Sequence, residues 1–177
     1  MPESDSALLN AQTASTERIA VVGLGNILMG DDGVGVLATE ALQREALPDN
    51  VEVFDAGTAL QDLMQELAGF ARVIFVDSCK AGGEPGAVYR NVHQPDAWDA
   101  DAMGDSLHDM NVAQVLRLHR VAGGELGEVV LIGIEPADIA LREGLSPELE
   151  RRLPAILQSI HNELVIPLEQ ERPGGAT

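Results

Sequence analysis

The chain has 177 residues, of which 45% are hydrophobic and 3% aromatic, and this suits one folded domain with a core of aliphatic side chains. Its formal net charge is −18, from 29 acidic side chains against 11 lysines and arginines. Because so acidic a surface repels the phosphate groups of nucleic acids and lipids, we expect neither nucleic acid nor a membrane surface among its partners.

Strand and helix patterns alternate between two terminal segments. We expect a flexible N-terminal extension over 1–17, a single α/β domain over 18–170 and a flexible tail over 171–177. Apolar runs predict strands at 18–25, 51–57, 72–78, 86–92 and 127–136. Helical patterns cover 34–47, 58–70 (with Thr58 as a possible cap), 106–120 and a long segment opened by Ser146 and Pro147. The alternation predicts a three-layer α/β fold, a mainly parallel twisted sheet of about five strands with helices on both faces.

Acidic residues follow three of the predicted strands. Asp31 and Asp32 lie in the loop after the first strand, Asp55 is in the last part of the second, and Asp77 is near the end of the third. Ligands of parallel sheets bind in the crevice at the carboxyl ends of the strands. We therefore expect these acids to gather along one rim of the sheet.

Residues 23–35, GLGNILMGDDGVG, allow two interpretations. The first two glycines fit the G-x-G-x-x-G dinucleotide fingerprint, and Asp55 could act as its ribose-binding acid. However, Leu28 takes the place of the third glycine, and the charges of Asp31 and Asp32 oppose a phosphate at the start of the next helix. The alternative is a cation site, in which Asp31 caps the helix and Asp32 faces the crevice.

His108 is the histidine best placed to bind a metal. It falls in the first turn of the helix predicted to begin at Ser106, where the helix dipole favours neutral imidazole, the form that ligates metals. Together, Asp32, Asp77 and His108 form an O, O, N donor set that suits a divalent transition metal with open positions.

The other histidines and the single cysteine are weaker candidates. His119 and His161 fall on helix patterns with no acidic partner in view, and His93 follows the fourth strand. Because Cys79 is the single cysteine, the chain can form neither an internal disulfide nor a cysteine-based zinc site. A nucleophilic dyad of Cys79 and His108 stays open. The first residues also lack the basic and apolar regions of a secretory signal, so we expect a cytoplasmic protein.

Several longer motifs occur in a characteristic order: VVGLGNILMGDDGVG, DAGT, VIFVDS, SLHDMNVAQVL, LIGIEP and GLSPELE. With these motifs the chain resembles the hydrogenase maturation endopeptidases from about Ile19 to about Leu164, nearly the whole predicted domain. Residues 81–105 match the family poorly, so the resemblance implies nothing about contacts there.

The resemblance implies an enzyme, most simply a monomer, that removes the C-terminal tail from the large-subunit precursor of a nickel–iron hydrogenase. In the family, three residues hold the metal, and they correspond to Asp32, where many members have Glu, and to Asp77 and His108. The nickel belongs to the precursor, and other divalent metals are expected at the same site in vitro. Two chemistries stay open: the metal polarises the scissile carbonyl and activates a water, or Asp32 or Asp77 acts as general base.

Overall fold

Five strands form one twisted sheet in the computed structural model, which describes residues 17–93 and 111–167. The strand order across the sheet is β2-β1-β3-β5-β4. Four strands run parallel, and β4 at the edge is antiparallel to β5. This confirms the predicted, mainly parallel five-stranded sheet. The strands are β1 (Ile19–Leu24), β2 (Val51–Gly57), β3 (Arg72–Ser78), β4 (Val88–His93) and β5 (Glu128–Ile134).

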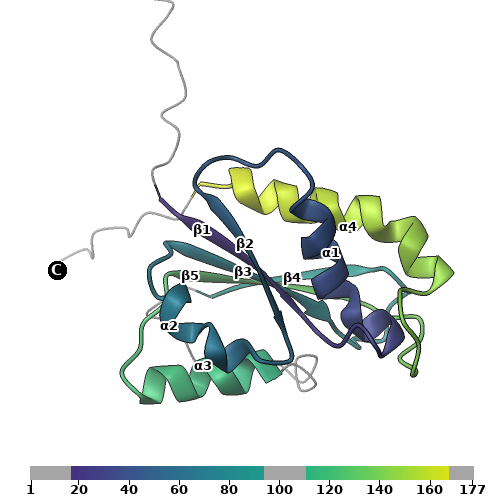
Figure 1. Ribbon diagram of the computed structural model, residues 1–177, viewed down its shortest axis with the longest axis horizontal. Helices are drawn as coiled ribbons and strands as arrows, with labels where there is room; N and C mark the ends of the chain where they lie inside the picture. Colours follow the sequence, from purple (N-terminus) through teal and green to yellow (C-terminus); the bar gives the residue numbers. More distant parts are fainter. Residues whose placement is uncertain (1–16, 94–110, 168–177) are drawn as a thin grey trace, which may run out of the picture.

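Helices cover both faces of the sheet, as predicted (Figure 1). Side chains alternate between the two faces along each strand, so Val21 and Val22 of β1 enter different cores. Val21 packs in the core on the side of α1 and α4, and Val22 in the core on the side of α2 and α3. The helices are α1 (Val34–Leu42), α2 (Met64–Leu67), α3 (Asn111–Val121) and α4 (Pro147–Val165).

Two helices are shorter than the sequence predicts. α1 ends at Leu42 rather than at residue 47, and the N–H groups of Arg44 and Glu45 then bond three residues back, to Ala41 and Leu42, in tighter turns. The segment 58–70 forms a 3-10 turn, η2 (Leu60–Asp62), and the single turn α2, and the Thr58 side chain caps neither. Both pieces bury apolar side chains at helical spacing. The predicted helical character of the segment is therefore correct, whereas the predicted length of the helix is wrong.

The start of α4 follows the prediction. The Ser146 hydroxyl accepts a hydrogen bond from the backbone N–H of Leu149 at 3.3 Å, and Pro147 is the first helical residue. The predicted cap Ser106, like His108, lies outside the described residues. No helix within the described part of the chain is both long enough and apolar enough to cross a membrane.

The strand order places a crevice between β1 and β3. From β1 the chain continues to β2 on one side, whereas β3 pairs with β1 on the other side. The loops that follow β1 and β3 therefore diverge at the carboxyl edge of the sheet, which is where open α/β sheets bind their ligands.

Candidate functional site

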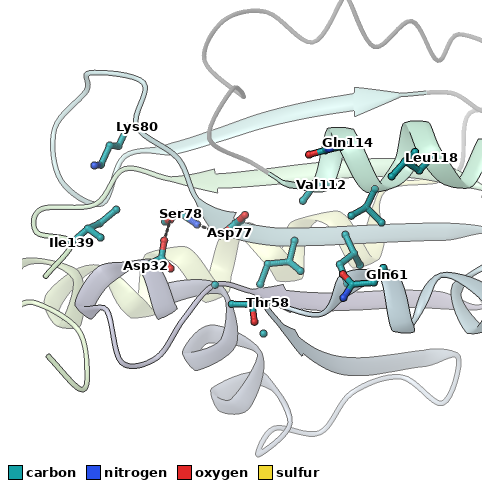
Figure 2. A pocket seen from close by; sticks show the side chains of 15 residues that line it. Asp32, Thr58, Gln61, Asp77, Ser78, Lys80, Val112, Gln114, Leu118 and Ile139 are labelled. Carbon is teal, nitrogen blue, oxygen red and sulfur yellow. Dashed lines mark hydrogen bonds between the residues drawn. The ribbon is translucent and has the colours of Figure 1, made fainter. Parts of the chain in front are cut away.

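A pocket of about 660 Å³ lies in this crevice (Figure 2). At one end are Asp32, from the 3-10 turn η1 (Gly30–Gly33), and Asp77, from the end of β3. At the other end Val112 and Leu118 of α3 contribute apolar side chains, next to the amides of Gln61 and Gln114. The pocket thus combines a pair of carboxylates with apolar side chains and a few polar groups, the mixture typical of a ligand site.

Hydrogen bonds hold both carboxylates in place through one residue, Ser78. Its hydroxyl donates to Asp32 Oδ1 at 3.1 Å, and its backbone N–H donates to Asp77 Oδ1 at 2.8 Å. Asp32 Oδ2 also accepts from the backbone N–H of Asn26 at 3.0 Å. The two acids predicted from the sequence therefore do come together, and Ser78, which the sequence analysis missed, connects them. Its position next to Asp77 in the VDS motif was the available signal.

The pKa of Asp77 lies far above its ordinary range. Burial is the main cause, the charge of Asp32 adds to it, and the hydrogen bond from Ser78 N–H opposes both; the result raises the pKa of Asp77 from 3.8 to about 7. A carboxyl group that titrates near neutral pH can release its proton when a cation binds, or, in its ionised form, accept a proton from a bound water. Such a group suits either of the two chemistries left open above.

The glycine loop serves the carboxylates and not a phosphate. The N–H of Asn26, in the turn where a dinucleotide fingerprint would present its amides, is already bonded to Asp32. Gly25 has a φ of +112°, and a Cβ there would lie 1.8 Å from the backbone oxygen of Asp32. Only glycine therefore allows the loop to fold this tightly around Asp32. This geometry disfavours the nucleotide interpretation.

Asp31 does not cap the helix after the loop, contrary to the prediction. Neither η1 nor α1 has a side-chain cap. The Asp31 carboxylate is instead fully buried and accepts hydrogen bonds from the backbone N–H groups of Ala137, Asp138 and Ser146 and from the Ser146 hydroxyl, at 2.6–3.0 Å. Burial tends to raise its pKa, but these hydrogen bonds outweigh that effect and lower it below the ordinary value. Asp31 thus fastens the β1–α1 loop to the segment before α4.

A second buried carboxylate, Glu135, fixes the loop that follows β3. It accepts hydrogen bonds from the backbone N–H groups of Ala81, Gly82 and Gly83 at 2.8–3.3 Å and from the Tyr89 hydroxyl at 2.8 Å. These bonds hold its pKa below the ordinary value although burial acts in the opposite direction. The sequence analysis assigned Glu135 no role, and its place directly after β5 in the IGIEP motif was the only signal.

The remaining predicted residues lie apart from the carboxylate pair. Asp55 is exposed, accepts a hydrogen bond from the N–H of Gly57 and lines a neighbouring pocket of about 240 Å³, which shares Gly25 and Thr58 with the larger one but not the carboxylate pair. Cys79 is buried, and its backbone N–H pairs with Ile134. His161 does have an acidic partner, against expectation, because its Nε2 lies 2.7 Å from Glu45.

Two further histidines complete the account. His93 is the last residue of β4, not part of the following loop, and burial lowers its pKa. His108 lies outside the described residues, so the third member of the predicted metal set stays a prediction, as does the Cys79–His108 dyad. Across 17–93 and 111–167, no three His, Cys, Asp or Glu side chains group closely enough to hold a metal by themselves.

Comparison with known proteins decides the family. The model of the family described as "Hydrogenase maturation protease" matches residues 36–163. The chain belongs to this family. A curated relative, the hydrogenase 2 maturation protease of Escherichia coli (strain K12), is 33% identical over 147 residues, which cover 81% of this chain and 88% of the relative.

Solved structures of hydrogenase maturation proteases have the same fold. The hydrogenase maturating endopeptidase HybD from E. coli superposes with a TM-score of 0.69 at 30% identity, covering 83% of this chain and 91% of that one. The [NiFe] hydrogenase maturation protease HycI from Thermococcus kodakarensis gives a TM-score of 0.64 at 26% identity, with coverages of 84% and 92%. The resemblance seen in the sequence motifs is confirmed, and the homologues of this chain are endopeptidases that act in hydrogenase maturation.

Proposed function

We propose that this hydrogenase maturation protease removes the C-terminal extension of a nickel–iron hydrogenase large-subunit precursor after nickel has been inserted. In this proposal Asp32, Asp77 and His108 contact the nickel of the precursor, which places the scissile peptide bond in the pocket. The observation that supports it most directly is the pair of carboxylates, from two separate segments of the chain, at one end of a pocket that also presents apolar side chains.

The chemistry of the pair fits recognition of a cation. Two acidic side chains in one partly buried site repel each other, which contributes to the raised pKa of Asp77. A divalent metal relieves this repulsion and binds carboxylate oxygen and imidazole nitrogen readily. An empty precursor would offer no such gain, so the site discriminates between nickel-loaded and nickel-free precursor through the charge it receives.

For the hydrolytic step, this chain supplies at least one group with suitable proton affinity. The pKa of about 7 belongs to Asp77 in the metal-free site; a carboxylate oxygen of Asp77 that is not bound to the nickel can accept a proton from an attacking water. The nickel, when bound, would polarise the scissile carbonyl and lower the pKa of a bound water. Asp32 is held by Ser78 and Asn26 and so keeps its carboxylate directed at the crevice throughout.

The proposal is tested with purified protein and the large-subunit precursor, loaded with nickel or nickel-free, followed on a gel as conversion to the shorter form. Wild-type protein should shorten only the loaded precursor. Asp32→Asn, Asp77→Asn and His108→Ala should each lose at least about 100-fold in rate, in the range expected for a group that acts in the transition state.

A matched control is Asp49→Asn, which removes the same charge from an exposed position just before β2, at the opposite end of the sheet. It should cleave at the wild-type rate. If the purified protein binds loaded precursor but never shortens it, the protein is a nickel checkpoint and another protease cuts. Normal cleavage by all three site variants would refute the assignment of the site.

A further inference from the structure

Lys80 is the one lysine in a chain of net charge −18, and it lines the same pocket as Asp32 and Asp77. Of the pocket-lining residues in the described part of the chain, these three are the ionisable ones. The remainder are apolar side chains, glycines, hydroxyl groups and amides. Lys80 is therefore the single positive charge that the described pocket wall offers to a ligand.

The ammonium group of Lys80 is available to a ligand. The side chain is exposed, and within residues 17–93 and 111–167 it forms no ion pair with a carboxylate of the protein. Figure 2 shows its amine end turned away from Asp77, on the side of the pocket where Ile139 lies. Lys80 thus does not serve to neutralise the carboxylate pair.

The backbone around Lys80 is held more firmly than an ordinary surface loop. β3 ends at Ser78, two residues before it, and Glu135 accepts hydrogen bonds from the three N–H groups that follow it. Glu135 itself is buried at the end of β5. The position of the ammonium group relative to Asp77 therefore depends mainly on the rotamers of its own side chain. Less conformational entropy is lost when it binds a ligand, because the backbone is already ordered.

We propose that Lys80 is a specificity-determining residue that binds a carboxylate of the precursor's C-terminal tail while the neighbouring peptide bond lies at Asp32 and Asp77. The inference rests on the proposed function of the site. A carboxylate is the anionic group that a polypeptide itself provides, either as an Asp or Glu side chain or as the terminal carboxylate of the tail. The net charge of −18 repels an acidic peptide at long range, and the ammonium group of Lys80 is the local positive charge that the described pocket wall offers such a peptide.

Because there is only one lysine, its charge can be altered chemically without mutation. Acetylation of lysines removes the charge of Lys80, whereas reductive methylation keeps it. We expect acetylated protein and Lys80→Gln to show a KM for the loaded precursor raised by about 10-fold, which corresponds to about 1.4 kcal/mol, with kcat changed by less than about twofold. Methylated protein and Lys80→Arg should keep the wild-type KM.

Two controls separate this effect from general changes of charge. Acetylation of the Lys80→Arg variant modifies the remaining amines and should leave KM unchanged. Arg151→Gln, which removes a positive charge from an exposed position on α4, across the sheet from α3, should also leave KM unchanged.

Two altered precursors identify the carboxylate. In one, the acidic residues of the tail are replaced by their amides; in the other, neutral residues added to the tail displace its terminal carboxylate. With one of these precursors, wild type should show a raised KM, and Lys80→Gln should then change the KM no further. That precursor has lost the carboxylate that Lys80 binds. If neither does so, the proposal is wrong.

Equal KM values for wild type, Lys80→Gln and acetylated protein would also overturn the proposal while leaving the proposed function intact. If wild type does not cleave at all, the proposed function fails, and the Kd of loaded precursor then decides the role of Lys80. A Kd about 10-fold weaker for Lys80→Gln than for wild type supports it, and an equal Kd, or no binding by either, refutes it.

Discussion

The raised pKa of Asp77 predicts how the stability of the protein depends on pH. In the folded protein this carboxyl group titrates at about 7, whereas its ordinary value, which applies in the unfolded chain, is 3.8. As pH rises, the unfolded state loses this proton first. The folded state binds this proton more tightly than the unfolded chain does, and the resulting stabilisation of the fold is complete below about pH 4. It is lost as pH rises through about 7, so the free energy of unfolding falls across that interval.

The magnitude follows from the difference between the two pKa values. A shift of roughly 3 units corresponds to about 4 kcal/mol at 1.36 kcal/mol per unit, and most of the loss falls between pH 5 and pH 8. Because Asp77 lines a pocket and is only partly shielded from solvent, screening reduces this to about 1–3 kcal/mol. Asp77→Asn, which cannot ionise, should therefore gain stability relative to wild type by about that amount as pH rises from 5 to 8.

Urea unfolding of metal-free protein, followed by circular dichroism at pH 5, 6, 7 and 8 and constant ionic strength, measures this difference. Asp49→Asn is the control, because it reports what removing one negative charge does to so acidic a chain. If the stability profiles of wild type and Asp77→Asn stay parallel over the whole interval, the carboxyl group of Asp77 is not perturbed, and its proposed role as a proton acceptor near neutral pH loses its basis.

Three further substitutions test buried contacts of the fold, two of them near the site and one at the opposite edge of the sheet. Asp31→Asn keeps the size of the side chain but confronts backbone N–H groups with an amide N–H, so thermal unfolding should show a loss of about 2–4 kcal/mol. Arg72→Met removes the positive charge that pairs with buried Glu128 at 2.5 Å and should lower the free energy of unfolding in urea by about 3–5 kcal/mol. Adding Glu128→Gln should recover part of this loss. Gly35→Ala would place a Cβ 2.0 Å from the backbone oxygen of Val76, so we expect weak soluble expression or a melting temperature lowered by 10 °C or so; a wild-type melting curve would contradict the close helix–strand contact.

The sequence was sufficient to predict the layers of the fold and the two carboxylates of the site. Continuous apolar runs reveal the buried strands locally, and the rule that parallel strands end at one edge brings Asp32 and Asp77 together without any structure. The length of α2 was predicted wrongly because the same apolar spacing fits one long helix or two short turns, and the tertiary crossing from β2 to β3 decides between them.

Long-range hydrogen bonds were beyond the reach of the sequence. Asp31 looked like a local helix cap, but its partners are more than 100 residues further along the chain. Similarly, Leu28 takes the place of the third glycine of the dinucleotide fingerprint, the one that allows close helix–strand packing. Gly35 of α1 fills that role instead, because it lies against the backbone of Val76 in β3. In both cases the residue type was informative, and only the folded chain shows which partner it meets.

Ser78 gives the two carboxylates a common support, and this makes them thermodynamically dependent on each other. Its hydroxyl binds Asp32 and its backbone N–H binds Asp77, so a change in one acid alters the orientation of the residue that holds the other. The effects of substitutions at the two acids on the proposed cleavage should therefore not sum. A longer carboxylate at either position would lose its present contact with Ser78 unless the serine moved with it, which would also shift the other acid's partner.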